Sequence, residues 1–165
     1  AMGSQELYDW LDAEPQLFHP GDLDYIHSVE RISKFSNVIS INGGVQLDLM
    51  GQENAESTGT RQLSGVGGQM DFLEGAHRSK GGKGFICINS SRLTKDGECK
   101  SNILAAIPGG STISASRTMI QYVATEYGIA SLSGKTLRER AEAMASIAHP
   151  DFREELMKYA RENFK

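Results

Sequence analysis

Three glycines within four positions are the feature that most constrains this chain. They are Gly65, Gly67 and Gly68, and we call residues 64–68 the Gly-rich loop. Glycines reach backbone conformations closed to other residues, and their amide N–H groups can lie close to a ligand. Such donors suit a phosphate or a developing oxyanion. A dinucleotide fingerprint would need glycine at Met70, and a P-loop would need Gly-Lys-Ser/Thr. The motif is therefore a loop of another kind, with a tight turn that binds no ligand as the alternative.

Length and charge set the broad class of the protein. A chain of 165 residues suits one domain with a substantial core. The net charge of −4 and the lack of any Lys/Arg block argue against a nucleic-acid partner, although backbone dipoles could still bind a small anion. No apolar run approaches the roughly 20 residues of a membrane span, so we expect no membrane partner. Residues 1–4 resemble the remnant of a cleaved tag, which leaves residues 5–165 as the domain.

Cysteine and histidine usage predicts no metal site. Cys87 and Cys99 are the only cysteines, and they are too few and wrongly spaced for zinc or a disulfide framework. Both are expected to be reduced, in a cytoplasmic protein, with Cys87 as a core thiol in an apolar strand. The four histidines lack ligand spacing, and His149, just before Pro150, is expected to cap a helix.

Hydrophobic spacing predicts a mixed α/β domain. In the C-terminal third, Thr136 and Glu139 form a capping box, and Pro150 opens a last helix. The predicted helices are residues 7–11, 22–34, one that follows 136 and one that begins at 150. The predicted strands are 38–42, 45–49, 85–88, 103–107 and 119–125, with turns at 43–44, 79–84 and 94–98.

Several carboxylates are candidates for chemistry. Glu126 follows the last predicted strand, where α/β domains place functional groups, so it could be a base, a nucleophile or a hydrogen-bond anchor. We prefer the structural anchor. Asp71, just after the Gly-rich loop, is expected to hold the loop rather than react. Glu53, Asn54 and Glu56 could line a cleft or belong to a solvated loop. No Gly-x-Ser-x-Gly elbow supports a serine hydrolase.

Eight segments in order carry a resemblance to one family. They are 7–12 (LYDWLD), 38–42 (VISIN), 48–52 (DLMGQ), 54–57 (NAES), the Gly-rich loop, 79–83 (SKGGK), 123–128 (VATEYG) and 147–153 (IAHPDFR). From about Leu7 to the end, the chain resembles the C-terminal part of the acetyl-CoA hydrolase/transferase family, which includes 4-hydroxybutyrate and succinyl-CoA:acetate CoA-transferases.

The resemblance implies a CoA-transferase-like α/β/α domain, with a mixed sheet and two C-terminal helices. It also implies class I CoA-transferase chemistry. In that chemistry a glutamate attacks the acyl-CoA to form an anhydride, and CoA re-attacks to form a glutamyl-CoA thioester. A carboxylic acid then takes the CoA, or water takes the acyl group. No cofactor is implied, because the CoA thioester is the substrate.

The same resemblance implies roles for the Gly-rich loop. The backbone N–H groups of Gly67 and Gly68 are assigned to an oxyanion hole, and the amides of Gly65 and Val66 could serve instead. The remaining substrate-binding candidates are Gln69, Asn42 and Glu56.

The family's nucleophilic glutamate lies upstream of Leu7–Asp12, before this sequence begins. Glu126 belongs to a different family segment, so nucleophile status does not transfer to it. The expected partners are acyl-CoA, a small carboxylate and the N-terminal half of the same protein, in a homo-oligomer when whole. We expect the chain alone to be inactive and to expose apolar surface, with low stability or self-association.

Two alternatives remain open from sequence. The first is an acyl-CoA hydrolase of the same family, which differs from a transferase in water access. The second is a non-catalytic module that binds acyl-CoA or docks within a larger protein. The intact Gly-rich loop favours the enzyme, because a docking module has no need of bare amides.

Overall fold

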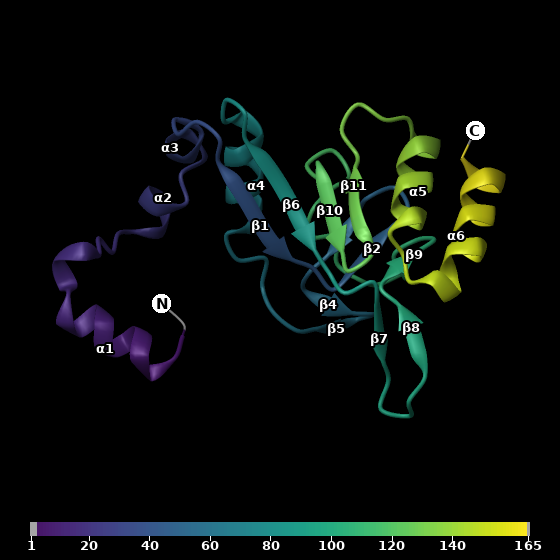
Figure 1. Cartoon of the computed structure of the whole chain (residues 1–165), viewed down its shortest axis with the longest axis horizontal. Helices are drawn as coiled ribbons and strands as arrows, with labels where there is room; N and C mark the ends of the chain where they lie inside the picture. The colour runs from purple at the N-terminus through teal and green to yellow at the C-terminus, as the bar shows by residue number, and fades with distance from the viewer. Residues whose placement is uncertain (1–2, 165) are drawn as a thin grey trace.

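A four-stranded mixed sheet forms the centre of the computed structural model, which describes residues 3–164. Its strands lie in the order β1, β6, β10, β11 (Figure 1). The first three are parallel, and β11 returns antiparallel to β10. Their bounds are β1 Ile39–Gly43, β6 Lys83–Cys87, β10 Tyr122–Thr125 and β11 Gly128–Ser131.

A helix that the sequence analysis missed, α4 (Gln69–Arg78), lies between β1 and β6 in the chain and packs on the sheet. Leu73 and Ala76 on its inner side are buried. Gly75 allows close packing of a second helix, because a Cβ there would lie 2.5 Å from Cγ2 of Ile32. The Gly-rich loop therefore runs directly into a helix N-terminus.

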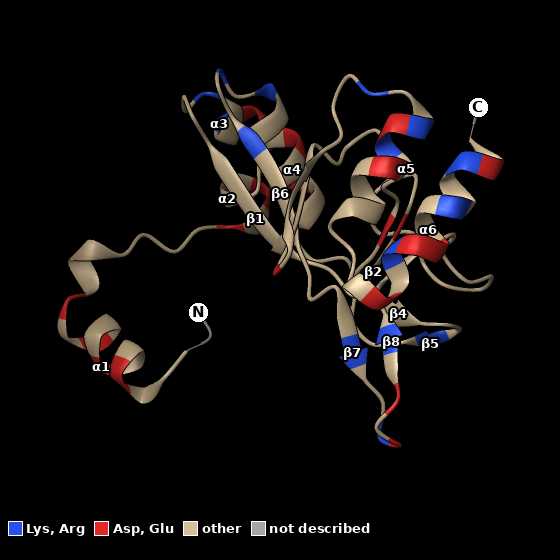
Figure 2. Cartoon of the chain, turned by 45° about the vertical axis from the view of Figure 1, so that its right-hand side comes forward, with Lys and Arg blue, Asp and Glu red and all other residues tan. Residues whose placement is uncertain are grey.

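The two predicted C-terminal helices are confirmed as α5 (Leu137–Ser146) and α6 (Pro150–Asn163). Both capping-box hydrogen bonds between Thr136 and Glu139 are present, and His149 caps α6 by accepting from the Asp151 amide. Figure 2 shows acidic and basic residues interspersed along both helices. These helices and the mixed sheet confirm the predicted mixed α/β class with two C-terminal helices.

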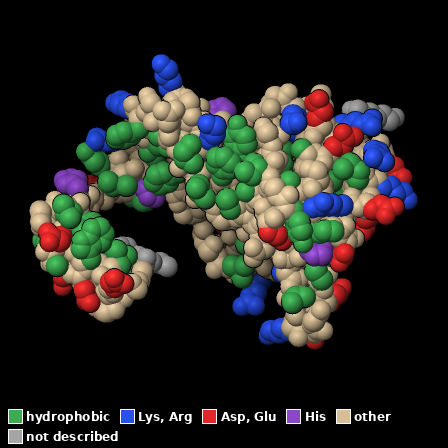
Figure 3. Space-filling view, in the orientation of Figure 1, with side chains coloured by type: hydrophobic (Ala, Val, Ile, Leu, Met, Phe, Trp, Pro, Cys, Tyr) green, Lys and Arg blue, Asp and Glu red, His purple; other side chains and the backbone are tan. Residues whose placement is uncertain are grey.

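Helices cover only one face of the sheet among the described residues. Ser40, Ile86, Val123 and Ala130 point to that face and are buried. The other face carries Ile39, Ile41 and Ile129, which are 50%, 69% and 63% exposed, and Phe85 stacked on Tyr122 with ring centroids 4.8 Å apart. We call these last five residues the open sheet face. Figure 3 shows apolar side chains gathered over β1, β6 and β10.

The predicted core position of Cys87 is wrong. Side chains alternate along β6, so that Ile86 is buried while Cys87 is exposed. An apolar strand places half of its side chains on each face, and here one face is uncovered.

A second sheet is built from short strands in the order β3, β2, β9. The two strands predicted on either side of the 43–44 turn therefore form, but in different sheets. The predicted 94–98 turn closes another hairpin, where the Thr94 amide donates to the Glu98 carbonyl at 2.8 Å. The strands are β2 Gln46–Asp48, β3 Glu53–Asn54, β9 Ile103–Leu104, and the hairpins β4 Ser57–Thr58 with β5 Arg61–Gln62, and β7 Ser91–Leu93 with β8 Cys99–Ser101.

The predicted helix 22–34 is wrong as one element. It is broken into α2 (Leu23–Ile26) and α3 (Val29–Ser33), because the Ser28 side chain accepts from the Arg31 amide and starts a new helix. The predicted first helix is confirmed as α1 (Gln5–Ala13), followed by the short η1 (Pro15–Leu17). Neither buries a residue, and Figure 1 shows this segment projecting from the body.

The predicted tag remnant lies partly outside the described residues, while Ser4 caps α1 by accepting from the Leu7 amide. The strand predicted at 119–125 begins only at Tyr122, because Met119 closes a turn on Ser116.

Candidate functional site

The parallel strands end at one edge of the sheet, and α4 begins there. In α/β sheets ligands bind beyond the carboxyl ends of parallel strands. An open pocket of about 470 Å³ lies at this edge. It is lined by Gly44, Cys87, Ile88, Asn89, Ala124 and Thr125.

The Gly-rich loop is held at its ends and open in its middle. At its start, the Leu63 and Ser64 amides donate to the Glu56 carbonyl at 2.7 and 3.2 Å. The amides of residues 65–68 donate to none of the described residues. Gly67 has a φ of 60°, and nothing lies within 4 Å of a Cβ built on Gly65 or Gly67. Free N–H donors beside open space are what an oxyanion site requires.

At Gly68 a glycine is required by close packing, in contrast to the open space beside Gly65 and Gly67. A Cβ there would lie 2.2 Å from Cε1 of His27, so the histidine ring occupies the space beside it. The His27 ring also packs edge-on against Phe72, and its Nδ1 lies 3.6 Å from a carboxylate oxygen of Asp71. Asp71 thus lies near the ring that covers Gly68, at a distance too long for a hydrogen bond, and its holding role stays a prediction.

Glu53 is fully buried beside the loop. Its Oε2 accepts a hydrogen bond from Nε2 of Gln69, whereas its Oε1 has no partner among the described residues. Burial raises the pKa of Glu53 to about 7, the Gln69 hydrogen bond lowers it in part, and the negative charge of Glu56 adds to the rise. Asn54 and Glu56 are buried too, so the predicted alternative of a solvated loop is wrong.

Glu56 and Asn42 make contacts within the protein. The Glu56 carboxylate accepts from Ser114 Oγ at 2.6 Å and from Gln62 Nε2 at 3.4 Å. Asn42, near the end of β1, donates to Ser40 Oγ at 2.8 Å. Val66 is 44% exposed in the loop. The structure thus brings Gln69 and Glu56 to the loop, and it shows no hydrogen bond between Asn42 and the loop.

Glu126 makes the hydrogen bonds of a structural anchor. Its carboxylate accepts from the Ser90 amide at 2.9 Å and from Ser90 Oγ at 2.6 Å, which fixes the segment after β6. Burial acts to raise the pKa of Glu126, but the two Ser90 hydrogen bonds, together with the Glu126 amide and His149, outweigh it and the net pKa is lowered. An ionised, exposed carboxylate already paired with two donors is poorly suited to act as a base.

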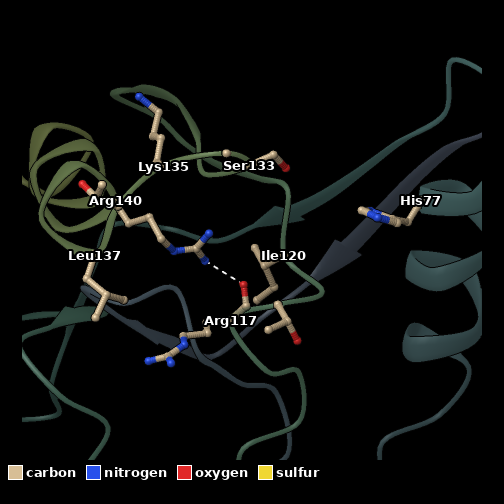
Figure 4. A pocket seen from close by; sticks show the side chains of 10 residues that line it. His77, Arg117, Ile120, Ser133, Lys135, Leu137 and Arg140 are labelled. Atoms are coloured by element: carbon tan, nitrogen blue, oxygen red, sulfur yellow. Dashed lines mark hydrogen bonds between the residues drawn. The ribbon is translucent and has the colours of Figure 1, made fainter.

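Another open pocket, of about 530 Å³, lies at the opposite edge of the sheet (Figure 4). Arg140 lines this pocket, and its side chain is buried, with 8% of the residue exposed. Its three nitrogens donate to the carbonyls of Met50, Leu132 and Arg117, each at 2.8 Å. Burial and then the neighbouring Arg117 charge lower the pKa of Arg140. The guanidinium joins three loops, which is a structural role.

Comparison with protein families matches residues 3–160 to the acetyl-CoA hydrolase/transferase C-terminal domain. The chain belongs to this family. It is 44% identical over 160 residues to butyryl-CoA:acetate CoA-transferase of Anaerostipes caccae, and 46% identical over 164 residues to 4-hydroxybutyrate coenzyme A transferase of Clostridium kluyveri. The alignments cover 97% and 99% of this chain, but 36% and 37% of those relatives. The chain therefore spans little more than a third of their length.

Solved structures also match this acetyl-CoA hydrolase/transferase domain over nearly its whole length and over about a third of their own. RipA from Yersinia pestis aligns with a TM-score of 0.82 at 37% identity, over 98% of this chain and 36% of that one. The 4-hydroxybutyrate CoA-transferase from Porphyromonas gingivalis aligns with a TM-score of 0.77 at 40% identity, over the same two shares. Among residues 3–164, no helix has the length and apolar composition needed to cross a bilayer.

Sequence reasoning missed several residues that shape this domain's site. His27 covers Gly68, and Ser90 orders the segment after β6 through Glu126. Both lie far along the chain from the residues they contact. Arg140 stands in an ordinary helical pattern, and nothing near it in sequence signals its three carbonyl partners.

Proposed function

We propose that this domain forms one wall of the acyl-CoA site of a CoA-transferase, with the Gly-rich loop as its oxyanion hole. The supporting observation is that the amides of residues 65–68 donate to none of the described residues, with open space beside Gly65 and Gly67 at the carboxyl edge of the sheet. Gly67 and Gly68 are the proposed donors, with Gly65 and Val66 beside them.

The chemistry needs such donors because attack on a thioester carbonyl places negative charge on its oxygen. A preorganised N–H donor stabilises that charge by about 3 kcal/mol. We assign the attack to a glutamate supplied by the region that precedes this match in the longer relatives, through a glutamyl-CoA intermediate. Glu126 stays an anchor in this scheme, and the CoA thioester is a substrate rather than a cofactor.

The open sheet face supports a partner for this wall. Parallel strands are normally covered by helices on both faces. Here at least half of the surface of three isoleucines is exposed, namely Ile39, Ile41 and Ile129. The stacked Phe85 and Tyr122 rings lie on the same face. We propose that the N-terminal part of the whole protein covers this face and completes the site. The chain alone is then expected to be inactive and prone to self-association.

A glycine pair provides the test. Gly67 and Gly59 have φ values of 60° and 57°, and a Cβ on either would meet nothing within 4 Å. Alanine at each position therefore causes a similar backbone strain. Alanine keeps the Gly67 N–H, but its Cβ would enter the open space beside the proposed oxyanion site and displace the thioester. In a protein that contains this domain and the preceding region, Gly67→Ala should therefore lower kcat for CoA transfer by about 100-fold, the cost of a misplacement of about 1 Å. Gly59→Ala should leave kcat close to wild type, and equal losses for both would refute the proposal.

Hydrolysis is the second candidate function, because acetyl-CoA hydrolase of Kluyveromyces lactis is 32% identical over 160 residues. The higher identity to the two transferases favours transfer. CoA release that requires an added carboxylic acid indicates a transferase, and release at the same rate without one indicates a hydrolase.

A further inference from the structure

The Gly-rich loop is fastened at both ends to one segment, residues 53–56. The Glu56 carbonyl holds Leu63 and Ser64 at the start of the loop. The Glu53 carboxyl holds the Gln69 side chain just after it. Because the amides between these anchors have no partner among the described residues, the anchors set the shape of the loop. Only the Glu53 anchor can change its charge.

The Glu53 side chain has little freedom to move away. The Glu53 amide donates to the Ala115 carbonyl at 3.0 Å, and its carbonyl accepts from the Ser114 amide at 2.8 Å. The carboxyl fills the space beside Gly44, where a Cβ would lie 2.6 Å from Oε1 and 3.0 Å from Cγ2 of Ile88. One carboxyl oxygen thus has no partner among the described residues, in a buried and partly apolar site.

The charged groups around Glu53 do not compensate a negative charge there. Glu56 adds to the negative charge nearby, and burial together with Glu56 raises the pKa of Glu53 to about 7 against the opposing Gln69 hydrogen bond. On β2, the Asp48 carboxylate is bound by the Gln52 amide and side chain at 2.9 and 2.7 Å. No Lys or Arg pairs with Glu53 among residues 3–164.

The other titratable groups lie on the far side of the loop. Asp71 belongs to the first turn of α4, and His27 covers Gly68. Their own contact, 3.6 Å between Nδ1 and Oδ2, is an ion pair only when His27 is protonated. An experiment must therefore separate any effect of this pair on the loop from that of Glu53.

We propose that Glu53 is a positioning residue for the Gly-rich loop, and that its neutral carboxyl keeps the loop amides free for an acyl oxygen. Ionisation would leave an anion with an unpaired oxygen, and a buried anion requires further donors. The unused donors that the same anchor holds in place are the loop amides. A negative charge there would also oppose an oxyanion. The role of Glu53 in catalysis rests on the proposed function. The effect of its ionisation on the loop does not, and it can be measured on this chain alone.

Nuclear magnetic resonance of this chain tests the inference. Between about pH 5.5 and 8.5, the wild-type amide signals of residues 65–68 and the Gln69 side-chain NH₂ signals should shift together, with a midpoint near 7. In Glu53→Gln this common shift should vanish. The exposed Glu155→Gln serves as the matched control and should behave as wild type.

Two outcomes would overturn the inference. One is a loop titration that persists in Glu53→Gln, which would assign it to another group. The other is a ¹³C carboxyl signal of wild-type Glu53 that titrates near its ordinary value of 4.5. The second measurement needs no variant, so it decides the matter even if Glu53→Gln does not fold.

Activity separates this inference from the proposed function. In an active protein containing the preceding region, kcat should fall above about pH 7 in wild type and not in Glu53→Gln. If the loop titrates as expected but the longer protein is inactive, the proposed function is refuted and the role of Glu53 in positioning the loop is not. An active enzyme whose loop does not titrate would refute the role of Glu53 alone.

Discussion

Replacing Glu53 with Gln should remove a large pH dependence from the stability of this domain. The pKa of Glu53 is about 7 in the folded protein, against an ordinary value of 4.5. Between these values the folded protein keeps a proton that the unfolded chain has released, so the free energy of unfolding falls as the pH rises. Each pH unit is worth about 1.4 kcal/mol, which gives a loss of about 3 kcal/mol by pH 8.

Glu53→Gln keeps the shape of the side chain and an acceptor for Gln69, but it cannot ionise. At about pH 5 the variant should be within about 1 kcal/mol of wild type, and at about pH 8 it should be more stable by about 3 kcal/mol. Glu155→Gln, at an exposed position of α6, should keep the wild-type pH dependence.

Urea unfolding followed by far-UV circular dichroism measures the difference. Fluorescence would report poorly on the core, because Trp10 is the only tryptophan and α1 buries no residue. If wild type and Glu53→Gln lose stability equally between pH 5 and 8, the buried carboxyl is not the cause and the reasoning is refuted.

Two further changes test the packing around the site. Gly68→Ala should lower the free energy of unfolding by about 1–3 kcal/mol, because its Cβ would overlap the His27 ring, whereas Gly65→Ala enters open space and should cost less than about 1 kcal/mol. Equal melting temperatures for these two variants would contradict the packing. Arg140→Met should cost about 3 kcal/mol or more by leaving three carbonyls without their donor, while the exposed Arg138→Met should stay within about 0.5 kcal/mol. A small loss for Arg140→Met in denaturant unfolding would argue against its role in joining the loops.

Elements with local signals were predictable from sequence. The Thr136–Glu139 capping box and Pro150 mark helix starts through contacts within one turn, and both are confirmed. The missed helix α4 lacks such a signal, because Gly75 interrupts a polar segment. That glycine reads as a helix breaker in sequence, whereas in the fold it makes room for Ile32.

The partners of strands were not predictable in the same way. Alternation around residues 43–44 correctly indicated two strands, but it contains no information on which strands pair with them. β1 pairs with β6, and β2 pairs with β3 and β9. The exposure of Cys87 has the same origin, because it depends on a sheet face that no described helix covers.

In the candidate site too, local features were predictable from sequence, whereas contacts between distant segments were not. The Gly-rich loop is contiguous, so its free amides could be anticipated from the glycines alone. The buried state of Glu53 could not, because it follows from the meeting of β3, Gly44 and α4. The hydrogen bonds from Ser90 to Glu126, 36 residues apart, likewise exist only in the folded chain.

An intact-mass spectrum recorded after incubation with acetyl-, propionyl- and succinyl-CoA would decide whether this domain is half of an acyl-CoA site. We expect no covalent adduct on this chain alone. We expect a CoA or acyl adduct, lost or reduced with borohydride, on a protein that also contains the preceding region. An adduct on the chain alone would contradict the proposal and would make Glu126 the first candidate nucleophile. The absence of any adduct on the longer protein would contradict it as well.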